Sequence, residues 1–437
     1  MCRARALVTA GDDEAAKLAY LDVLHADPAH CGALIELGAL AYAGGFVSAA
    51  LGAYRQAVRC HPGDKIARAG YAMLLSEAGD AVSARSHYRA ALAIDPDLPS
   101  AHQGLARLLT EAGEDGGEHW RKGFVGHAIA RRRYRGTGTG VPLLLLVAAV
   151  GGNVPMQRWI DDRVFAVTAI HADFFDPDDP LPPHAMIVNT IGDADLCDHA
   201  LASAERIVAR CTAPVINPPA AVRATTRENN ARRLAALPDV IAPRITRLSR
   251  LSAPRFPLLL RAPGYHTGQF FVRVETPDTL DRKAASLPGG EPLAIEYLDA
   301  RGPDGMARKY RVMAIGGRLY PLHLAISADW KVHYFTAGMA ADSAFRAEER
   351  RFLDDMPAVL GARAMAALAG LQAVLGLDYA GVDFAVAADG RLLLFEANAT
   401  MAIIPPSDDP MWDYRRPAAD SALTAARGLL PRSAWRL

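Results

Sequence analysis

Residues 381–400 read GVDFAVAADGRLLLFEANAT, and this segment has the pattern of a β-hairpin. Bulky residues alternate with other residues on both sides of Asp389-Gly390, a dipeptide that suits a two-residue type I′ turn. If these two residues form the loop, Asp383 lies opposite Glu396 on the neighbouring strand. Asn398 then lies on the same face as Glu396, because side chains alternate along a strand.

The two facing carboxylates need a reason, since like charges directly opposite each other destabilise a sheet. A bound cation removes the repulsion, and the oxygen atoms of Asp383, Glu396 and Asn398 suit Mg²⁺. Proteins usually hold Mg²⁺ with one or two carboxylates together with substrate phosphates. The hairpin therefore predicts a site for Mg²⁺ and ATP. The alternative is a surface hairpin with two solvated acids and an Asn that caps a helix.

The chain has 437 residues, 48 basic and 48 acidic, which allows two or three domains and gives no basic excess for a nucleic-acid partner. Its first residues lack the apolar core of a signal peptide. The longest apolar run, 141–150, is too short to span a membrane. The five cysteines are scattered and form no CxxC pair, which suits a reducing compartment. We therefore expect a cytoplasmic protein with no membrane contact and no bound nucleic acid.

Residues 10–113 repeat with a period of 34. Glycine, tyrosine and proline each recur in register: Gly11, Gly45, Gly79 and Gly113; Tyr20, Tyr54 and Tyr88; Pro28, Pro62 and Pro96. This pattern resembles the tetratricopeptide repeat, a helix–turn–helix unit. We expect residues 1–113 to form an α-solenoid, in which glycine ends one helix and proline opens the turn before the next unit.

Such a solenoid has a concave surface that suits an extended or helical peptide, so a peptide or protein substrate is the expected partner. Self-association into a homodimer and a purely structural spacer remain alternatives. Residues 114–140 are expected to hold a closing helix and then a glycine-rich linker. Within them, residues 131–135 are interpreted as a solvated helix end, with an acidic partner as the alternative.

The remaining chain alternates predicted strands and helices, which indicates an α/β region. Residues 141–150 and 185–192 are predicted to be buried parallel strands, and residues 163–175 another strand. We place a parallel α/β domain at 141–219 and a two-lobed domain with a C-terminal helix at 220–437. The expected fold class is thus a multidomain α+β protein with an N-terminal α-solenoid.

With its elements in this order, the chain from about 141 to 410 resembles the ATP-grasp superfamily, in particular the RimK-like glutamate ligases and the D-alanine–D-alanine ligases. The most specific element is the hairpin DF…LLLFEAN. The resemblance implies that Asp383, Glu396 and Asn398 hold Mg²⁺ and that ATP binds between two α+β lobes. It also implies an enzyme that uses ATP to convert a carboxylate to an acyl phosphate, which an amine then attacks.

The resemblance assigns further residues to ATP. Arg261 stands where the family commonly has a phosphate-binding Lys, and the loop residues His266, Thr267 and Gly268 would fold over the phosphates. LAIEYLD resembles the adenine hinge, in which Glu296 and Leu298 offer backbone groups to the adenine and Tyr297 lies between them. Asp304, or alternatively Asp299, would bind the ribose hydroxyls.

In RKYRV, Arg311 resembles the family's phosphate-contacting Arg, with Lys309 beside it, and Arg311 could also stabilise the oxyanion as the amine attacks. Lys331 and His333 lie in an expected loop that would contact substrate. His323 has a substrate role or, as for most lone histidines, a structural one.

These residues predict an ATP- and Mg²⁺-dependent carboxylate–amine ligase that acts on a peptide or protein recruited by the solenoid, with a small molecule or peptide as the amine. Two alternatives remain open. One is a phosphotransferase on the same fold, and the other is a non-catalytic adaptor that only binds ATP.

Overall fold

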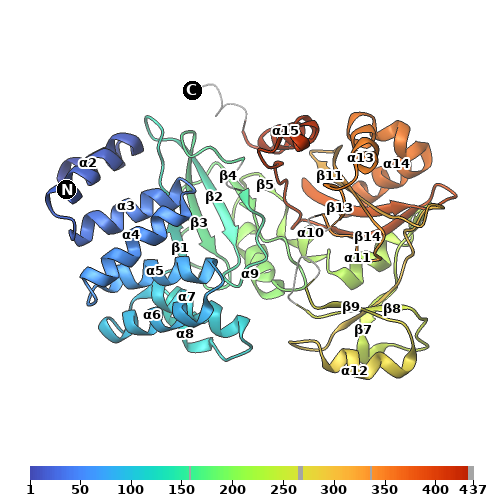
Figure 1. Ribbon diagram of the computed structural model, residues 1–437, viewed down its shortest axis with the longest axis horizontal. Helices are drawn as coiled ribbons and strands as arrows, with labels where there is room; N and C mark the ends of the chain where they lie inside the picture. The colour runs from blue at the N-terminus through green and yellow to red at the C-terminus, as the bar shows by residue number, and fades with distance from the viewer. Residues whose placement is uncertain (157–158, 264–268, 335–336, 432–437) are drawn as a thin grey trace. The chain divides into compact units, whose positions relative to one another are not determined.

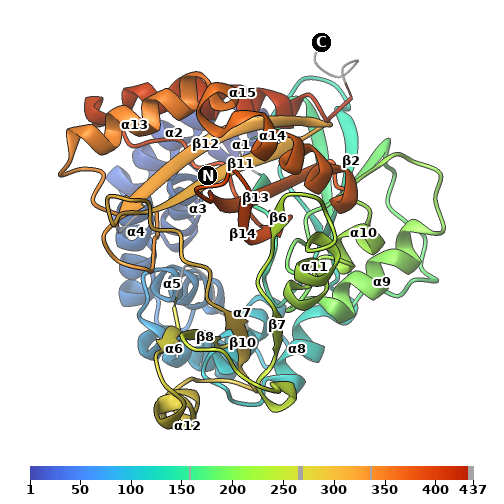
Figure 2. The same ribbon diagram turned by 90° about the vertical axis from the view of Figure 1, so that its right-hand side faces the viewer.

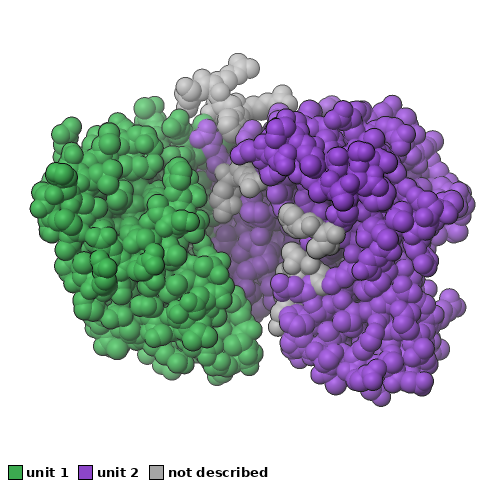
Figure 3. Space-filling model, in the orientation of Figure 1, with its two compact units in different colours: residues 1–142, 162–181 green, residues 143–161, 182–437 purple. Residues whose placement is uncertain are grey.

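The computed structural model describes residues 1–156, 159–263, 269–334 and 337–431. The chain forms two compact units (Figure 3): residues 1–142 with 162–181, and residues 143–161 with 182–437. These bounds differ from the four expected segments, since residues 162–181 belong to the helical unit and the second unit begins at 143. Each unit is described here by itself.

Unit 1 begins with helices whose bounds repeat every 34 residues (Figure 1). Helices α2, α4 and α6 cover Asp13–Ala26, Val47–Cys60 and Ala81–Ile94, and helices α3, α5 and α7 cover Cys31–Ala43, Lys65–Glu77 and Pro99–Glu111. A short helix α1 (Cys2–Thr9) precedes them. The predicted helical repeat is thereby confirmed.

The periodic glycines end helices, as expected. Gly11, Gly45, Gly79 and Gly113 all have φ between 73° and 84°, a left-handed conformation that favours glycine after a helix. The periodic tyrosines are buried between helices. Tyr54 and Tyr88 pack so closely on Gly70 and Gly104 that a Cβ at either glycine would lie within 2.3 Å of a ring atom.

After the repeats, helix α8 (Gly117–Phe124) packs on α7, and strand β1 (Ile129–Arg131) follows. Strand β1 pairs antiparallel with β3 (Phe165–His171) in the same unit. The interpretation of residues 131–135 as a solvated helix end is therefore wrong. The Arg135 guanidinium instead donates to both oxygens of Asp162, at 2.7 and 2.9 Å, and to Asp13 at 3.2 Å.

Unit 2 contains the predicted parallel strands. Strand β4 (Met186–Asn189) pairs in parallel with β2 (Val141–Val147) and with β5 (Val215–Ile216). Helix α9 (Asp198–Val208) connects β4 to β5. The loop at 192–195 after β4 lies at the carboxyl edge of these strands, the edge where parallel sheets usually bind ligands.

Two further sheets complete unit 2, and Figure 2 shows them one above the other. The smaller sheet has the order β7-β10-β8-β9 and the larger has the order β12-β11-β13-β14-β6. The strands of the smaller sheet are β7 (Ile245–Arg247), β8 (Leu258–Arg261), β9 (Phe271–Val274) and β10 (Leu293–Glu296). Those of the larger are β6 (Val240–Ile241), β11 (Ala307–Ile315), β12 (Arg318–Ser327), β13 (Tyr379–Val386) and β14 (Leu392–Asn398).

Helices flank both sheets. Helices α13, α14 and α15 lie over one face of the larger sheet in Figure 1, and α12 lies beside the smaller one. Two short helices, α10 and α11, precede β6, and η4 lies near the C-terminus. The bounds of all these helices in chain order are α10 Pro219–Arg223, α11 Arg227–Leu234, α12 Leu280–Ala285, α13 Ser343–Asp354, α14 Met356–Leu375, η4 Pro410–Arg415 and α15 Arg416–Arg427. The helix predicted at 220–237 is thus two helices, because Thr226 caps a new one.

Among the described helices, α14 alone is long and apolar enough to cross a membrane. Two observations fit a core helix better. Gly361 has a non-helical backbone that kinks α14, and the buried residues recur every three or four positions on one face: Met356, Leu360, Ala364, Ala367, Leu368, Leu371 and Leu375.

Candidate functional site

A cavity of about 390 Å³ lies within unit 2, between the smaller and the larger sheet. Side chains of β8, β9 and β10 line one side, and side chains of β11 to β14 line the other. The loop at 192–195, the start of α11, residues that follow β10, the loop at 330–334 and residues that follow β14 also line it. The volume falls in the range of small-molecule sites.

The predicted facing of Asp383 and Glu396 is confirmed, because the two residues are paired across β13 and β14. The predicted turn is wrong. Ala387 N–H donates to Arg391 O at 2.8 Å, so the loop has three residues, and Gly390 has a φ of 81°. Such loops place a glycine in the left-handed conformation, whereas a type I′ turn would require it of two residues.

A β-bulge restores the predicted register. Val386 pairs with Leu392 and Phe384 with Leu394, and then Asp383 pairs with Glu396, so Phe395 is the extra residue. Without this bulge, Asp383 would face Phe395, and Glu396 would point to the other side of the sheet. Bulges are common beside functional sites because they re-aim a side chain.

Four polar residues form one row across the larger sheet. Glu396 pairs with Asp383, Asp383 pairs with Arg311, and Arg311 pairs with His323. All four line the cavity. The row therefore places two acids, a guanidinium and an imidazole side by side on four neighbouring strands.

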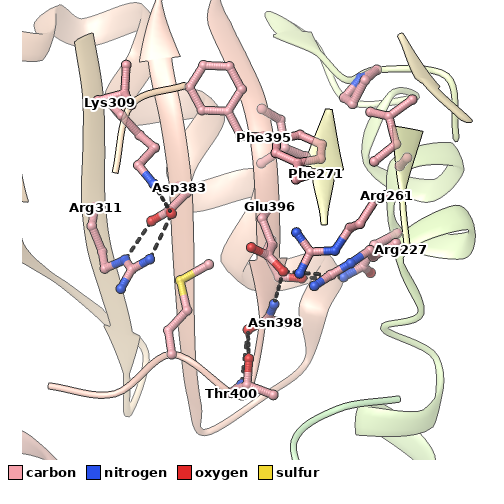
Figure 4. Close-up of a pocket in the computed structure, with 18 of the residues that line it drawn as sticks. Arg227, Arg261, Phe271, Lys309, Arg311, Asp383, Phe395, Glu396, Asn398 and Thr400 are labelled. Carbon is pink, nitrogen blue, oxygen red and sulfur yellow. Dashed lines mark hydrogen bonds and ion pairs between the residues drawn. The ribbon is translucent and has the colours of Figure 1, made fainter. Parts of the chain in front are cut away.

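Asp383 is held by two cations (Figure 4). Arg311 Nε and Nη2 donate to its two oxygens at 2.6 and 2.8 Å, and Lys309 Nζ lies 3.2 Å from Oδ2. Burial raises the pKa of this carboxyl group, but Arg311 and Lys309 outweigh burial and hold the pKa below its usual range. Asp383 is thus a carboxylate at neutral pH.

Glu396 is held by groups that sequence reasoning partly missed. Arg227 Nη1 donates to Glu396 Oε1 at 2.6 Å, and Asn398 Nδ2 donates to the same oxygen at 2.8 Å. Burial raises the pKa of Glu396, whereas Arg227 and Arg261 lower it, and the result is a lowered pKa. Figure 4 shows Arg227 and Arg261 converging beside this acid.

Thr400 fixes the amide of Asn398. The backbone N–H of Thr400 donates to Asn398 Oδ1 at 3.0 Å, and its hydroxyl donates to the same oxygen at 2.7 Å. These bonds explain why the NH₂ group of Asn398 faces Glu396.

The residue types suit Mg²⁺, because two carboxylates and one amide with hard oxygen atoms line the cavity. The amide oxygen of Asn398 accepts from Thr400 and its NH₂ group faces Glu396, so this amide would have to turn to become a ligand. In the described residues, however, no group of three or more His, Cys, Asp or Glu side chains is arranged around one point. Arg311 forms an ion pair with Asp383, and Arg227 forms one with Glu396. Binding a cation here therefore requires the two arginines to release Asp383 and Glu396.

An aromatic wall closes the smaller-sheet side. Phe271 and Trp330 have ring centroids 5.6 Å apart, and Tyr297 meets Trp330 edge-on at 6.5 Å. The Arg273 guanidinium lies 4.3 Å from the Tyr297 ring centroid, and Arg261 lies 5.8 Å from Phe271. The ring planes are inclined to one another, by 56° and 76°, so each ring separately offers an apolar face near a cation on which a planar group could stack.

The expected hinge is only partly available. The Glu296 N–H donates to Arg244 O at 2.9 Å, so this amide is already used within the sheet. The carboxylate of Glu296 accepts from the Arg244 N–H at 3.1 Å. Strand β10 ends at Glu296, and Tyr297 and Leu298 follow it along the cavity wall.

The structure brings eleven of the predicted site residues to this cavity: Arg261, Glu296, Tyr297, Leu298, Lys309, Arg311, Lys331, His333, Asp383, Glu396 and Asn398. Burial lowers the pKa of His333, and Lys309 and Arg311 lower it further, so this histidine is neutral at pH 7. The predicted loop residues His266, Thr267 and Gly268 lie outside the described residues.

Asp304 is not among the residues described as lining the cavity. Its two oxygens accept from Arg308 Nη1 and Nη2 at 3.0 and 2.8 Å, and Arg308 also binds Glu348. Asp304 forms an ion pair with Arg308, four residues further along the chain. Ribose binding by Asp304 stays a prediction, and it would require Arg308 to release this acid.

Sequence reasoning missed the contribution of the loop at 192–195 and of α11. Asp195 Oδ2 accepts from the backbone N–H of Arg227 at 3.1 Å, and burial raises the pKa of Asp195. Asn230 Nδ2 donates to the Ala397 carbonyl at 2.6 Å. The only sequence signal was the capping residue Thr226 directly before Arg227.

No known protein family's sequence profile matches this chain. No curated protein matches it either. Among solved structures, MamA is similar at 22% identity over 28% of this chain and 72% of MamA, with a TM-score of 0.26. A tetratricopeptide repeat protein from Parabacteroides merdae ATCC 43184 is similar at 20% identity over 28% of this chain and 50% of its own, also with a TM-score of 0.26. At TM-scores this low the likeness carries no argument about function.

Proposed function

We propose that this chain is an ATP- and Mg²⁺-dependent carboxylate–amine ligase of the ATP-grasp type. The observation that carries the proposal is the pair Asp383 and Glu396, which lie opposite each other on two strands within a cavity between two sheets. Two facing carboxylates in a buried place are costly, and a function that needs both of them accounts for their presence.

The charges in the cavity support a ligand that carries both signs. Five acids and five cations line it: Asp193, Asp195, Glu296, Asp383 and Glu396, against Arg227, Arg261, Lys309, Arg311 and Lys331. A metal–polyphosphate complex satisfies both sets, because carboxylates bind the cation and guanidinium and ammonium groups bind phosphate oxygens. A ligand of one sign that broke the ion pairs of Asp383 with Arg311 and of Glu396 with Arg227 would leave the opposite set without partners.

Asp383, Glu396 and the amide oxygen of Asn398 would hold Mg²⁺. When bound, this ion would neutralise phosphate charge at the site of transfer. Release of Asp383 frees the fork of Arg311, which matches phosphate and carboxylate oxygens in pairs. Lys309, two residues from Arg311 on β11, faces the same cavity and adds a second positive charge there.

The reaction needs no protein nucleophile. The substrate carboxylate oxygen attacks the γ-phosphorus of ATP and ADP leaves, and the amine nitrogen then attacks the acyl carbon while the C–O bond to phosphate breaks. The chain's cations, Lys309, Arg311 and Lys331, would position the anionic oxygens and offset their charge. The two sheets would exclude water, which otherwise hydrolyses an acyl phosphate.

The helical repeat of unit 1 would recruit a peptide or protein that carries one of the two reacting groups. Its regular helix pairs are the kind of scaffold that binds extended chains. Removing residues 1–113 should therefore weaken turnover of a peptide substrate more than turnover of a small one.

Three variants test the metal assignment. We expect Glu396→Ala and Asp383→Asn to abolish ADP release and product formation from ATP and pooled amino acids and peptides, read by mass spectrometry. Asp389→Asn is the matched control, because Asp389 lies on the turn of the same hairpin, is exposed and pairs with Arg391. Unchanged ATP-dependent product formation in Glu396→Ala would refute the assignment.

A second candidate function is a non-catalytic adaptor that binds a nucleotide. The ion pairs of Asp383 with Arg311 and of Glu396 with Arg227 favour it, because they satisfy both acids without a metal. Calorimetry with ATP, with and without Mg²⁺, separates the two. Binding that is independent of Mg²⁺, together with no turnover, supports the adaptor.

A further inference from the structure

His323 is a buried histidine that no other role explains. Its exposed fraction is 4%, and neither ring nitrogen has a hydrogen-bond partner in the described part of the chain. A buried polar group without a partner is costly, and native structures contain few of them. His323 lines the cavity, so a ligand there is able to supply the missing partner.

The ring is held in place by a neighbouring network. The ring centroids of His323 and Tyr334 are 4.5 Å apart. The Tyr334 hydroxyl accepts from Arg415 Nη1 at 3.0 Å, and Arg415 Nη2 donates to the fully buried Glu349 at 2.6 Å. The imidazole is therefore pre-positioned by packing in the cavity wall, where its two nitrogen atoms are buried and have no hydrogen-bond partner among the described residues.

The surrounding charges select the kind of ligand. Arg311 lies directly opposite His323, and Lys309 and Arg415 also act on it, whereas Asp383 is already paired with Arg311 and Lys309. Burial and Arg311 hold the pKa of His323 well below its usual range. A neutral imidazole offers one N–H to an anionic oxygen, and the neighbouring cations disfavour a metal ion at this place.

The position of His323 separates this anion from the phosphates. It lies on β12, two strands from Asp383 on β13, with Arg311 of β11 between them. Neighbouring strands are about 4.8 Å apart, so the backbones of His323 and Asp383 are roughly 10 Å apart. A phosphate held near Asp383 and an anion held at His323 would thus meet Arg311 from its two sides, and Arg311 is placed to bridge them.

We propose that His323 binds the carboxylate of the acyl donor, through one imidazole N–H, together with Arg311. The inference rests on the proposed ligase function, because that reaction needs a carboxylate beside the phosphates. It names a residue that determines which substrate is accepted. A cationic group in the same place would be repelled by Arg311 and Lys309, and an uncharged group would lack the attraction that a carboxylate has to them.

Imidazole ¹⁵N NMR of the full chain tests the proposal, with glutarate as the carboxylate probe and inorganic phosphate as the competing anion. We expect the His323 signals, assigned by their loss in His323→Gln, to shift on addition of glutarate. In His323→Phe, glutarate binding measured by calorimetry should weaken at least about tenfold, as for loss of a hydrogen bond to a charged group. His323→Gln keeps an N–H donor and should lose less.

His184→Phe is the matched control, since His184 bonds the Pro182 carbonyl and is not among the described residues lining the cavity. Glutarate binding should be unchanged in this variant. His323 signals that do not move with glutarate, or that move only with inorganic phosphate, overturn the proposal.

A parallel titration with Mg²⁺ and a non-hydrolysable ATP analogue keeps the two proposals apart. Failure of the analogue to bind counts against the ligase function, whereas His323 is judged by the glutarate titration of the chain alone. Should His323→Phe not fold, the wild-type NMR titration decides.

Discussion

Replacing Arg415 by Met tests the network behind the cavity. Arg415 and Glu349 form the most buried ion pair described in unit 2, with side-chain exposures of 8% and 0%. Arg415 donates to Glu349 Oε2 through Nε at 3.0 Å and through Nη2 at 2.6 Å. Met preserves much of the aliphatic volume and removes both donors.

The expected loss of unfolding free energy depends on the hydrogen bonds that Glu349 keeps after Arg415 is replaced. Removing one partner of a buried ion pair typically costs ~3–5 kcal/mol of unfolding free energy, because the other charge stays buried. Two donors stay on Glu349: the Tyr414 hydroxyl at 2.5 Å and the Leu324 N–H at 3.2 Å. We therefore expect the lower end of this range, about 3 kcal/mol.

Urea unfolding followed by tryptophan fluorescence measures this loss, since Trp412 lies 4.0 Å from the Arg415 guanidinium. Arg416→Met is the matched control, because Arg416 is the next residue, is 36% exposed and pairs with Asp413 at the surface. The control should lose at most ~1 kcal/mol. Glu349→Gln combined with Arg415→Met should be less destabilised than the sum of the single variants by ~1–3 kcal/mol. A loss below ~1 kcal/mol in Arg415→Met, or strict additivity, would refute the reasoning.

Two further outcomes are expected. Gly104→Ala should destabilise unit 1 by ~1–3 kcal/mol in thermal unfolding, because its Cβ would lie 2.0 Å from Tyr88 Cζ. The control Gly52→Ala should be neutral or slightly stabilising, because its Cβ would meet nothing within 4 Å. Equal losses of stability in the two variants would contradict the packing argument. Because the pKa of His323 is lowered in the fold, the unfolded chain takes up a proton near pH 6.5 and the folded chain does not. The free energy of unfolding is therefore unaffected by this histidine above pH 6.5 and falls as the pH drops below that value. Between pH 7.5 and 5.5, His323→Gln should lose ~1 kcal/mol less unfolding free energy than the wild type, and an identical pH dependence would show that His323 is protonated in the fold.

The sequence predicted the helical array well because its signals are local. Each periodic glycine needs a left-handed backbone after a helix, and each periodic tyrosine fills the space between helices. Most of the predicted site residues line the cavity, since alternation along β11, β13 and β14 is a local property. The facing of Asp383 and Glu396 is the clearest example.

The errors have long-range causes. Arg227 and Asp195 reach the cavity only because α11 and the loop after β4 are brought there by the fold of unit 2. Residues 163–175 contain strand β3, as predicted, and only its antiparallel partner β1 was not foreseen.

The hairpin carries a consequence for comparisons between chains. The loop holds one residue more than a two-residue turn, and Phe395 adds one more to the return strand. The hairpin in turn has one cross-strand pair fewer between the loop and Asp383. The number of residues between Asp383 and Glu396 is therefore what a hairpin with a two-residue turn and no bulge would have. An alignment with such a hairpin would show no gap and would match both acids, although the two backbones differ at two places. Agreement of acidic positions over this segment thus reports where the carboxylates point and conceals how the chain gets them there.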